Sequence, residues 1–231
     1  MLALNLPGFG GAPPLPPGIA PTLGALTDAV ERNLDEAGFA RPFIAGNSLG
    51  GWIALELARR GRVRGVVALS PAGMWTPPER AYSRALLRLM YAATRRIRPY
   101  AGPITRPAVG RTAVFSLVSA RPWRIAPDEA REAVEALADA DVFLPTLDHA
   151  LGGRAERLGE IEAPVLIGWG TRDALLLPRQ GPRCARAIPG AELRLLPGCG
   201  HVPMWDDAGL VASTILDLTV RVAAAPTEAP V

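Results

Sequence analysis

Residues 46–51 read Gly46-Asn47-Ser48-Leu49-Gly50-Gly51, between an apolar run at 43–46 and a helical pattern at 49–60. A serine with glycines two residues before and two residues after it, in that context, is typical of a nucleophile elbow, a tight strand-to-helix turn. The glycines let neighbouring backbones approach without a Cβ clash. The turn exposes the serine hydroxyl beside the N-terminus of a helix, where an oxyanion is stabilised. The stretch therefore predicts a parallel sheet that carries a nucleophilic Ser48.

A serine hydroxyl is a poor nucleophile and needs a general base. The chain contains two histidines. His201 follows a predicted strand at 192–196, which puts it at the carboxyl end of a strand, where open parallel sheets build their sites. His149 lies in a stretch without strands and has no such placement. We therefore expect His201 to be the base.

The base needs a carboxylate to orient it. Asp173 comes just after the predicted strand at 163–169, again at a carboxyl end. The chain order Ser48, Asp173, His201 is the order expected for a nucleophile elbow on this kind of sheet. Asp206 and Asp207 are the competing acids, but they start the last predicted helix and are expected to cap it. The sequence therefore predicts a Ser48–His201–Asp173 triad.

Apolar runs alternate with helical patterns over most of the chain, which predicts βαβ units and a parallel sheet. Strands are expected at 2–6, 43–46, 63–69, 163–169 and 192–196. Helices are expected at 23–37, 49–60, 179–187 and 207–222, with fraying from Ala223 onward. Residues 75–153 contain no convincing buried strand and are expected to form helices broken at Pro99, Pro103, Pro107 and Pro122. The expected organisation is an α/β core built from 1–74 and 154–231, with 75–153 as a helical insertion.

The amino-acid composition excludes several classes of function. All 25 basic residues of the 231 are arginines, which excludes a Schiff-base lysine and a P-loop lysine. Two cysteines, Cys184 and Cys199, are too few for a disulfide framework or a zinc site. No apolar run approaches the roughly 18 residues that span a bilayer, and the N-terminus shows no signal-peptide pattern. We therefore expect a cytoplasmic protein without stable membrane insertion, metal or cofactor, and the oligomeric state stays open.

The insertion is electrically lopsided. Residues 79–124 contain ten arginines and one acid, whereas 125–162 contain ten acids and three arginines. Arg80, Arg84 and Arg88 recur on one helix face. Pairing between the basic and acidic halves is the favoured interpretation, and attraction of an anionic substrate or membrane surface is the alternative. Nucleic-acid binding is not expected, because no aromatic residues are interleaved with the arginines.

The sequence resembles the α/β-hydrolase superfamily, in particular its cap-bearing esterase and C–C hydrolase branch. The matching stretches are LNLPGFG at 4–10, GNSLGGWIALELA at 46–58, APVLIGWGTRDALLLP at 163–178 and LPGCGHVPMWDD at 196–207. The resemblance implies an α/β-hydrolase fold whose sheet is mostly parallel, with a helical cap inserted after the third strand present. It implies that Ser48 is the nucleophile, His201 the base and then acid, Asp173 its orienter, and the Leu49 N–H an oxyanion-hole donor. Trp52 and the cap helices are candidates for the pocket wall, with core packing as the alternative for Trp52.

The sequence departs from the family pattern in two places. Ala12 stands where the family usually carries a serine. More seriously, LNLPGFG belongs to the family's fourth strand, and the three preceding strands and the His-Gly loop are not found before it. Loss of that loop would remove the second oxyanion donor, which typically costs about 10²–10³-fold in rate, and would expose the apolar 2–6 strand as an edge. We expect Met1 to be a start codon assigned too late, a hypothesis that translation of the upstream DNA tests.

The leading functional hypothesis is a serine hydrolase that cleaves a carboxylic ester or similar acyl bond of a small molecule through an acyl-enzyme. C–C bond hydrolysis of a dienoate-type ring-cleavage product is an alternative, since an arginine-rich cap suits an acid. Acyl transfer would use the same triad. A non-catalytic fragment or binding scaffold is the alternative from another class.

Overall fold

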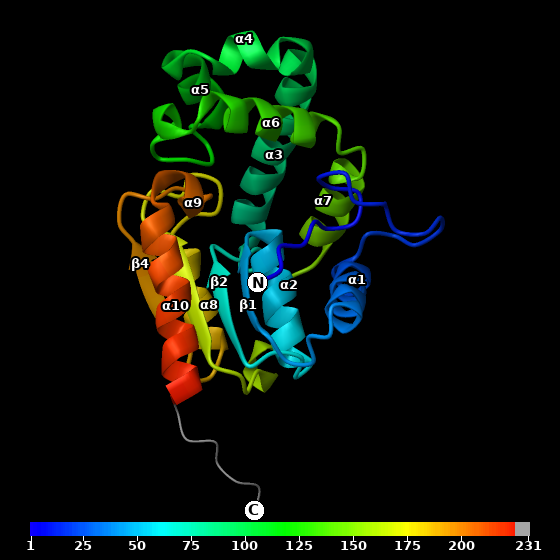
Figure 1. Ribbon diagram of the computed structural model, residues 1–231, viewed down its shortest axis with the longest axis vertical. Coiled ribbons are helices and arrows are strands. Elements are labelled where there is room, and N and C mark those ends of the chain that lie inside the picture. The colour runs from blue at the N-terminus through cyan, green and yellow to red at the C-terminus, as the bar shows by residue number, and fades with distance from the viewer. Residues whose placement is uncertain (225–231) are drawn as a thin grey trace, which may run out of the picture.

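The computed structural model describes residues 1–224, and its centre is a four-stranded parallel sheet (Figure 1). The strands are β1 (Phe43–Asn47), β2 (Gly65–Leu69), β3 (Val165–Gly170) and β4 (Glu192–Leu196), and they lie in the order β1-β2-β3-β4. Phe43 is opposite Gly65, Val66 opposite Val165 and Leu166 opposite Glu192. All four strands coincide with strands that the sequence predicts. Because they are parallel, their carboxyl ends meet at one edge of the sheet.

The predicted strand at 2–6 is wrong. No strand is assigned there, and Leu2 and Leu4 are exposed. The apolar run is real, but among the described residues no strand lies beside it to pair with its backbone groups. The insertion consequently follows the second strand of this structure, not the third.

Helices cover both faces of the sheet. Alternate residues of β2 point to opposite faces, so Val66 and Ala68 join one core cluster and Val67 and Leu69 join another. The first cluster includes buried residues of α1 (Leu23–Glu36), α2 (Leu49–Arg59) and α8 (Gln180–Ala187). The second is closed by α10 (Ala208–Ala224), which follows the short α9 (Pro203–Asp206). These helices confirm the sequence pattern to within two residues. The expected fraying is wrong at Ala223 and Ala224, which belong to α10, and its remainder lies outside the described residues.

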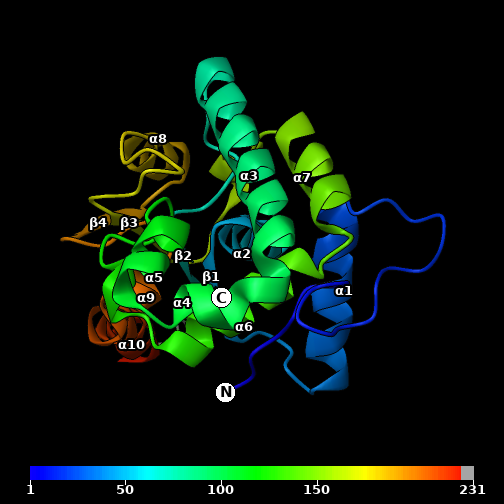
Figure 2. The same ribbon diagram turned by 90° about the horizontal axis from the view of Figure 1, so that it is seen from above.

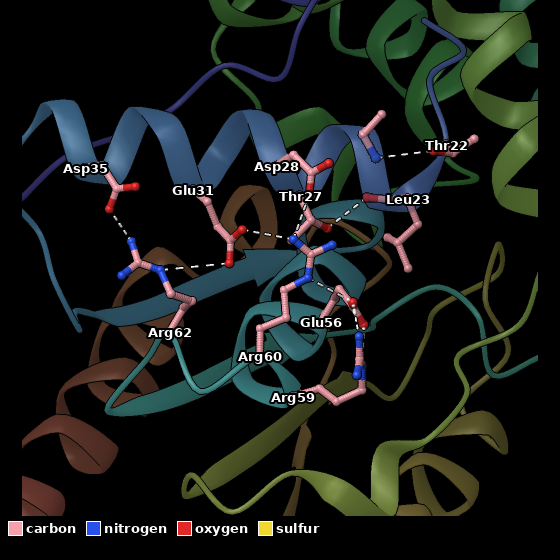
Figure 3. A network of polar contacts seen from close by, with 11 residues as sticks. Thr22, Leu23, Thr27, Asp28, Glu31, Asp35, Glu56, Arg59, Arg60 and Arg62 are labelled. Atoms are coloured by element: carbon pink, nitrogen blue, oxygen red, sulfur yellow. Dashed lines mark hydrogen bonds and ion pairs between the residues drawn. The ribbon is translucent and has the colours of Figure 1, made fainter.

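An arginine network fastens α1 to α2 (Figure 3). Arg60 at the end of α2 lies 2.7 Å from Asp28 and 2.9 Å from Glu31, both on α1. Arg62 is paired with Asp35 in the same way. Hydrogen bonds from Arg59 lower the pKa of Glu56, which also accepts a hydrogen bond from Arg60. The network holds the helix that follows Ser48 against its neighbour.

The insertion is helical throughout its defined elements and covers one end of the sheet (Figures 1 and 2). Its helices are α3 (Pro77–Ile97), α4 (Ala101–Thr105), α5 (Ala108–Phe115), α6 (Pro127–Ala138) and α7 (Phe143–Gly152). Short 3₁₀ turns lie at η1 (Arg98–Tyr100) and η2 (Pro122–Arg124), and a third, η3 (Leu158–Glu160), leads back to the core. Breaks therefore occur at Pro99, Pro107 and Pro122 as predicted. Pro103 does not break α4, because it lies in the first turn, where a helix tolerates proline.

The two oppositely charged halves of the insertion pair with each other. Arg88 lies 2.7 Å from Asp148, and Arg98 lies 2.5 Å from Asp139. These contacts confirm the favoured interpretation of the charge pattern. In the part of the chain that the structure describes, no helix has the length and apolarity to cross a membrane.

A buried carboxylate attaches the insertion to the core. Glu79, in the first turn of α3, is 2% exposed. Its carboxylate accepts hydrogen bonds of 2.6 Å from Arg179, which directly precedes α8, and 2.8 Å from Arg183, which lies in α8. Burial opposes its ionisation, but the hydrogen bonds from Arg183 and Arg179 outweigh burial and lower the pKa of Glu79 to about 2. The base of α3 is thus held to the core by an ion cluster that the sequence pattern did not reveal.

Candidate functional site

Ser48 lies in a strained turn between β1 and α2. Its φ is +54°, in the left-handed region that a non-glycine residue rarely adopts. A Cβ at Gly46 would lie 2.2 Å from the carbonyl oxygen of Gly50, so only glycine fits there. A Cβ at Gly50 would meet nothing within 4 Å, so the expected steric need for that second glycine is wrong. The turn therefore has the geometry expected of a nucleophile elbow, with Gly46 as the glycine it requires.

Asp173 and His201 are brought together at the same edge of the sheet. The Asp173 Oδ2 atom lies 2.9 Å from His201 Nδ1, and the two residues are 2% and 3% exposed. The other Asp173 oxygen, Oδ1, accepts hydrogen bonds from the backbone N–H groups of Leu175 (3.0 Å) and Leu176 (2.8 Å). The carboxylate is thus fixed on both oxygens, and it fixes the imidazole ring in turn.

Close backbone approach makes this pairing possible. A Cβ at Gly170, the last residue of β3, would lie 2.2 Å from the carbonyl oxygen of Gly200. Glycine at that position lets the loop that carries His201 pass directly over the end of the strand that precedes Asp173. The same loop is held to β1, because Asn47 Nδ2 donates hydrogen bonds to the carbonyl oxygens of His201 (2.9 Å) and Leu69 (3.0 Å). The residue before Ser48 therefore contacts the backbone of His201.

Among residues 1–224, no hydrogen bond joins the Ser48 hydroxyl to the His201 ring. The structure therefore brings Asp173 and His201 into contact. Ser48 directly follows Asn47, whose side chain holds the His201 backbone. Leu49 is the first residue of α2, so its backbone N–H lies at the positive end of the helix dipole. His149 lies near the end of α7, exposed to solvent and away from this cluster of residues.

Ser48 lines a cavity of about 380 Å³ whose wall is mostly apolar. The insertion supplies much of that wall through α3 and α7, including Leu87, Phe143 and Leu147. The N-terminal segment supplies Leu4, Leu6 and Phe9, the core supplies Leu175 and Leu176, and Trp75 comes from the first residue of the insertion. None of the described residues that line it carries a charged side chain. The cavity is suited to an uncharged, apolar group next to the serine hydroxyl.

Of the two alternatives for Trp52 the structure shows core packing, and it corrects the expectation for Asp206. Trp52 does not line the cavity: it is 4% exposed and packs edge-to-face on Trp75 at 5.8 Å between ring centroids, so Trp75 forms the wall instead. Asp207 caps α10 by accepting a hydrogen bond from the Leu210 N–H at 2.9 Å, as expected. Asp206 does not cap that helix, because its carboxylate turns toward the loop before His201.

Burial keeps both thiols protonated. It raises the pKa of Cys184 to about 12 and that of Cys199, which is also near Asp206, to about 11. Within the described residues, no group of three or more His, Cys, Asp or Glu side chains is placed to hold a metal ion.

The chain belongs to the alpha/beta hydrolase family, whose model matches residues 1–214. It has the fold of that family, a parallel sheet flanked by helices, and is a hydrolase. The match to the family model confirms the resemblance that the sequence motifs indicate.

Among curated relatives, the epoxide hydrolase EphH of Mycobacterium tuberculosis is 31% identical over 197 residues, which are 82% of this chain and 91% of that protein. A 2-hydroxy-6-oxononadienedioate/2-hydroxy-6-oxononatrienedioate hydrolase of Klebsiella pneumoniae is 38% identical, but over 28% of this chain and 23% of its own length. Among solved structures, the enol-lactonase from Burkholderia xenovorans has a TM-score of 0.72 at 22% identity, covering 94% of this chain and 79% of that one. At that identity the last likeness shows the fold alone.

Proposed function

We propose that this protein is a serine hydrolase that cleaves an uncharged carboxylic ester or similar acyl bond through an acyl-enzyme on Ser48. The 2.9 Å contact between His201 Nδ1 and Asp173 Oδ2, at the sheet edge that also carries Ser48, is the observation that carries the proposal. A buried carboxylate that accepts a hydrogen bond from Nδ1–H keeps the proton on that nitrogen and leaves Nε2 free to act as a base. The strained turn at Ser48 supports the same assignment, because such strain persists where function requires it.

The proposed reaction has two steps. In the first, His201 Nε2 takes the Ser48 proton while Oγ attacks the ester carbonyl, and the Leu49 N–H donates to the oxyanion. The leaving alcohol then receives that proton, and an acyl-Ser48 ester remains. In the second step, His201 takes a proton from a water that attacks the acyl carbonyl. As the bond between that carbon and Ser48 Oγ breaks, His201 returns the proton to Oγ, so the carboxylic acid and the free serine are released. Asp173 holds the ring and stabilises its charged form throughout.

The cavity favours an ester over a ring-cleavage product. A dienoate of that kind carries at least one carboxylate, and burial of an unpaired charge in an apolar wall is strongly unfavourable. The described lining offers no arginine, although the insertion is rich in arginine. We therefore assign residues 75–153 the role of an apolar cap over the acyl group, and the C–C hydrolase alternative has less support.

Epoxide hydrolysis is a second candidate, favoured by the relative from Mycobacterium tuberculosis. Attack of a serine alkoxide on an epoxide carbon would give an ether, which water does not readily cleave. An epoxide would therefore have to be opened directly by a water that His201 and Asp173 activate, without a covalent bond to Ser48.

One substrate panel separates these functions. We expect the protein to hydrolyse p-nitrophenyl esters with acyl chains of two to eight carbons, and Ser48→Ala to lower kcat by at least about 10³-fold. A dienoate ring-cleavage product and styrene oxide form the other arms. Turnover of styrene oxide that survives in Ser48→Ala would establish the epoxide route, and turnover of the dienoate alone would establish C–C hydrolysis.

A further inference from the structure

The Asp206 carboxylate is a buried junction between two segments that are far apart in the sequence. Its Oδ2 accepts hydrogen bonds from the N–H groups of Gly200 (2.6 Å) and Ala120 (3.1 Å). Its Oδ1 accepts hydrogen bonds from the Ser119 hydroxyl (2.7 Å) and the Arg121 N–H (2.7 Å). Asp206 is 5% exposed and Ser119 3% exposed. Four donors converge on the two oxygens, so both oxygens of the side chain act as acceptors within the protein.

These contacts tie residues 118–121 of the insertion to the loop that carries His201. The Val202 N–H donates a hydrogen bond of 2.7 Å to the carbonyl oxygen of Val118, on the other side of His201. A Cβ at Gly200 would lie 2.8 Å from the backbone nitrogen of Ala120, so the two segments are in direct backbone contact. The Cys199–Gly200 peptide and the His201–Val202 peptide, on the two sides of His201, are therefore both anchored to the insertion.

We propose that Asp206 is a positioning residue for His201: through the Gly200 N–H it holds the Cys199–Gly200 peptide, one residue before His201, against residues 118–121, so that the direction of the imidazole depends on the insertion being seated on the core. The proposal rests on the proposed function, in which His201 is the base. Asp173 fixes the ring at one atom, but the Cα from which the ring extends is fixed by its neighbouring peptides. Because a displacement of about 1 Å at a reacting group lowers rates by up to about 10²-fold, loss of this anchor acts on the chemical step more than on substrate binding.

The chain offers a matched pair of variants. Asp206→Asn replaces one acceptor oxygen by an NH₂ group that must face an N–H or O–H donor, which breaks one half of the junction. Asp207→Asn makes the same chemical change one residue later, where the carboxylate caps α10 and makes no described contact with the His201 loop. We expect Asp206→Asn to lower kcat for the best ester by about tenfold or more, with KM within about twofold, and Asp207→Asn to leave both within about twofold.

Proton NMR tests the position of the His201 ring without requiring substrate turnover. The His201 Nδ1 proton, shared with buried Asp173, gives a far-downfield proton resonance, whereas the ring protons of exposed His149 exchange rapidly with water. We expect this resonance to shift or broaden in Asp206→Asn and to be unchanged in Asp207→Asn. If wild-type protein hydrolyses no ester, the proposed function fails, and the resonance still tests the junction.

A wild-type kcat together with an unchanged Nδ1 resonance in folded Asp206→Asn would overturn the proposal. If Asp206→Asn does not fold, Ser119→Ala takes its place, because it removes one donor and leaves the carboxylate. We expect kcat about threefold lower in Ser119→Ala at unchanged KM, and a kcat equal to that of the wild type would contradict the positioning role.

Discussion

The side-chain amide of Asn47 donates a hydrogen bond of 2.9 Å to the carbonyl oxygen of His201, 154 residues further along the chain. Asn47 is the last residue of β1 and directly precedes Ser48. The bond therefore fixes the distance between the turn that carries the serine and the loop that carries the imidazole. The motif Gly46–Gly51 contains Asn47 but does not by itself reveal this role, because the partner of Asn47 lies on a distant loop.

We expect Asn47→Ala to lower kcat about tenfold, because the two hydrogen bonds that hold the His201 loop and the end of β2 are lost. The free energy of unfolding should fall by about 1–2 kcal/mol, the usual net value for two such bonds. Ester kinetics and thermal denaturation measure the two effects. Asn33→Ala, on α1 away from the cavity lining, is the control and should leave kcat unchanged.

Ser48→Ala and His201→Ala should lose ester turnover to a similar extent, at least about 10³-fold each, and the double variant should lose little more, because members of a triad act as a unit. His149→Ala should retain wild-type kcat. Steady-state kinetics of the four variants test this, and additive losses in the double variant would argue against a shared mechanism.

Ala150→Trp should select against long acyl chains. Ala150 lies on α7 and lines the cavity, so an indole there fills space that the acyl chain is proposed to occupy. We expect kcat/KM for octanoate esters to fall about tenfold or more, while that for acetate esters stays within about threefold. An equal loss for both esters would show that the acyl chain lies elsewhere.

Glu79 should make stability depend on pH in the acid range. Its pKa is about 2 in the folded protein, against an ordinary value of 4.5, so the ionised form is favoured by folding. The stabilisation is complete above about pH 4.5 and is lost as the pH falls toward 2. Glu79→Gln should therefore lower the free energy of unfolding by about 1–3 kcal/mol at pH 7, and the difference from the wild type should shrink below pH 4.5.

Asp139→Asn is the matched control for Glu79→Gln. Like Glu79, Asp139 is an acid of the insertion that pairs with an arginine, but its side chain is half exposed. Its effect on stability should be small at every pH, since exposed ion pairs contribute little. A Glu79→Gln difference that persists at pH 2 would contradict the role assigned to the buried cluster.

The sequence predicts the four strands of the sheet because each is a short stretch rich in apolar residues and flanked by turn residues, and strand ends are where parallel sheets carry chemistry. That reasoning led to Asp173 and His201, which the structure places in contact. It went wrong at 2–6, because an apolar run shows a tendency to be buried and not the presence of a neighbouring strand. Sheet pairing is a property of the whole fold.

The roles of residues that depend on distant partners could not be predicted from the sequence. Glu79 and Asp206 each look like an ordinary helix-end acid, and only the fold shows that Glu79 meets Arg183 and that Asp206 meets Gly200. Trp52 was a candidate for the pocket wall and Trp75 was not, yet the two rings pack together and Trp75 is the one beside the cavity. Periodicity predicts which face of an element is apolar, but not which element it meets.

The most direct test of the central claim is to label the wild-type protein with a fluorophosphonate and map the modified peptide by mass spectrometry. We predict one adduct, on Ser48, formed at a rate that His201→Ala lowers by at least about 10²-fold and absent from Ser48→Ala. A folded protein that takes up no label, or takes it up on another residue, would contradict the account.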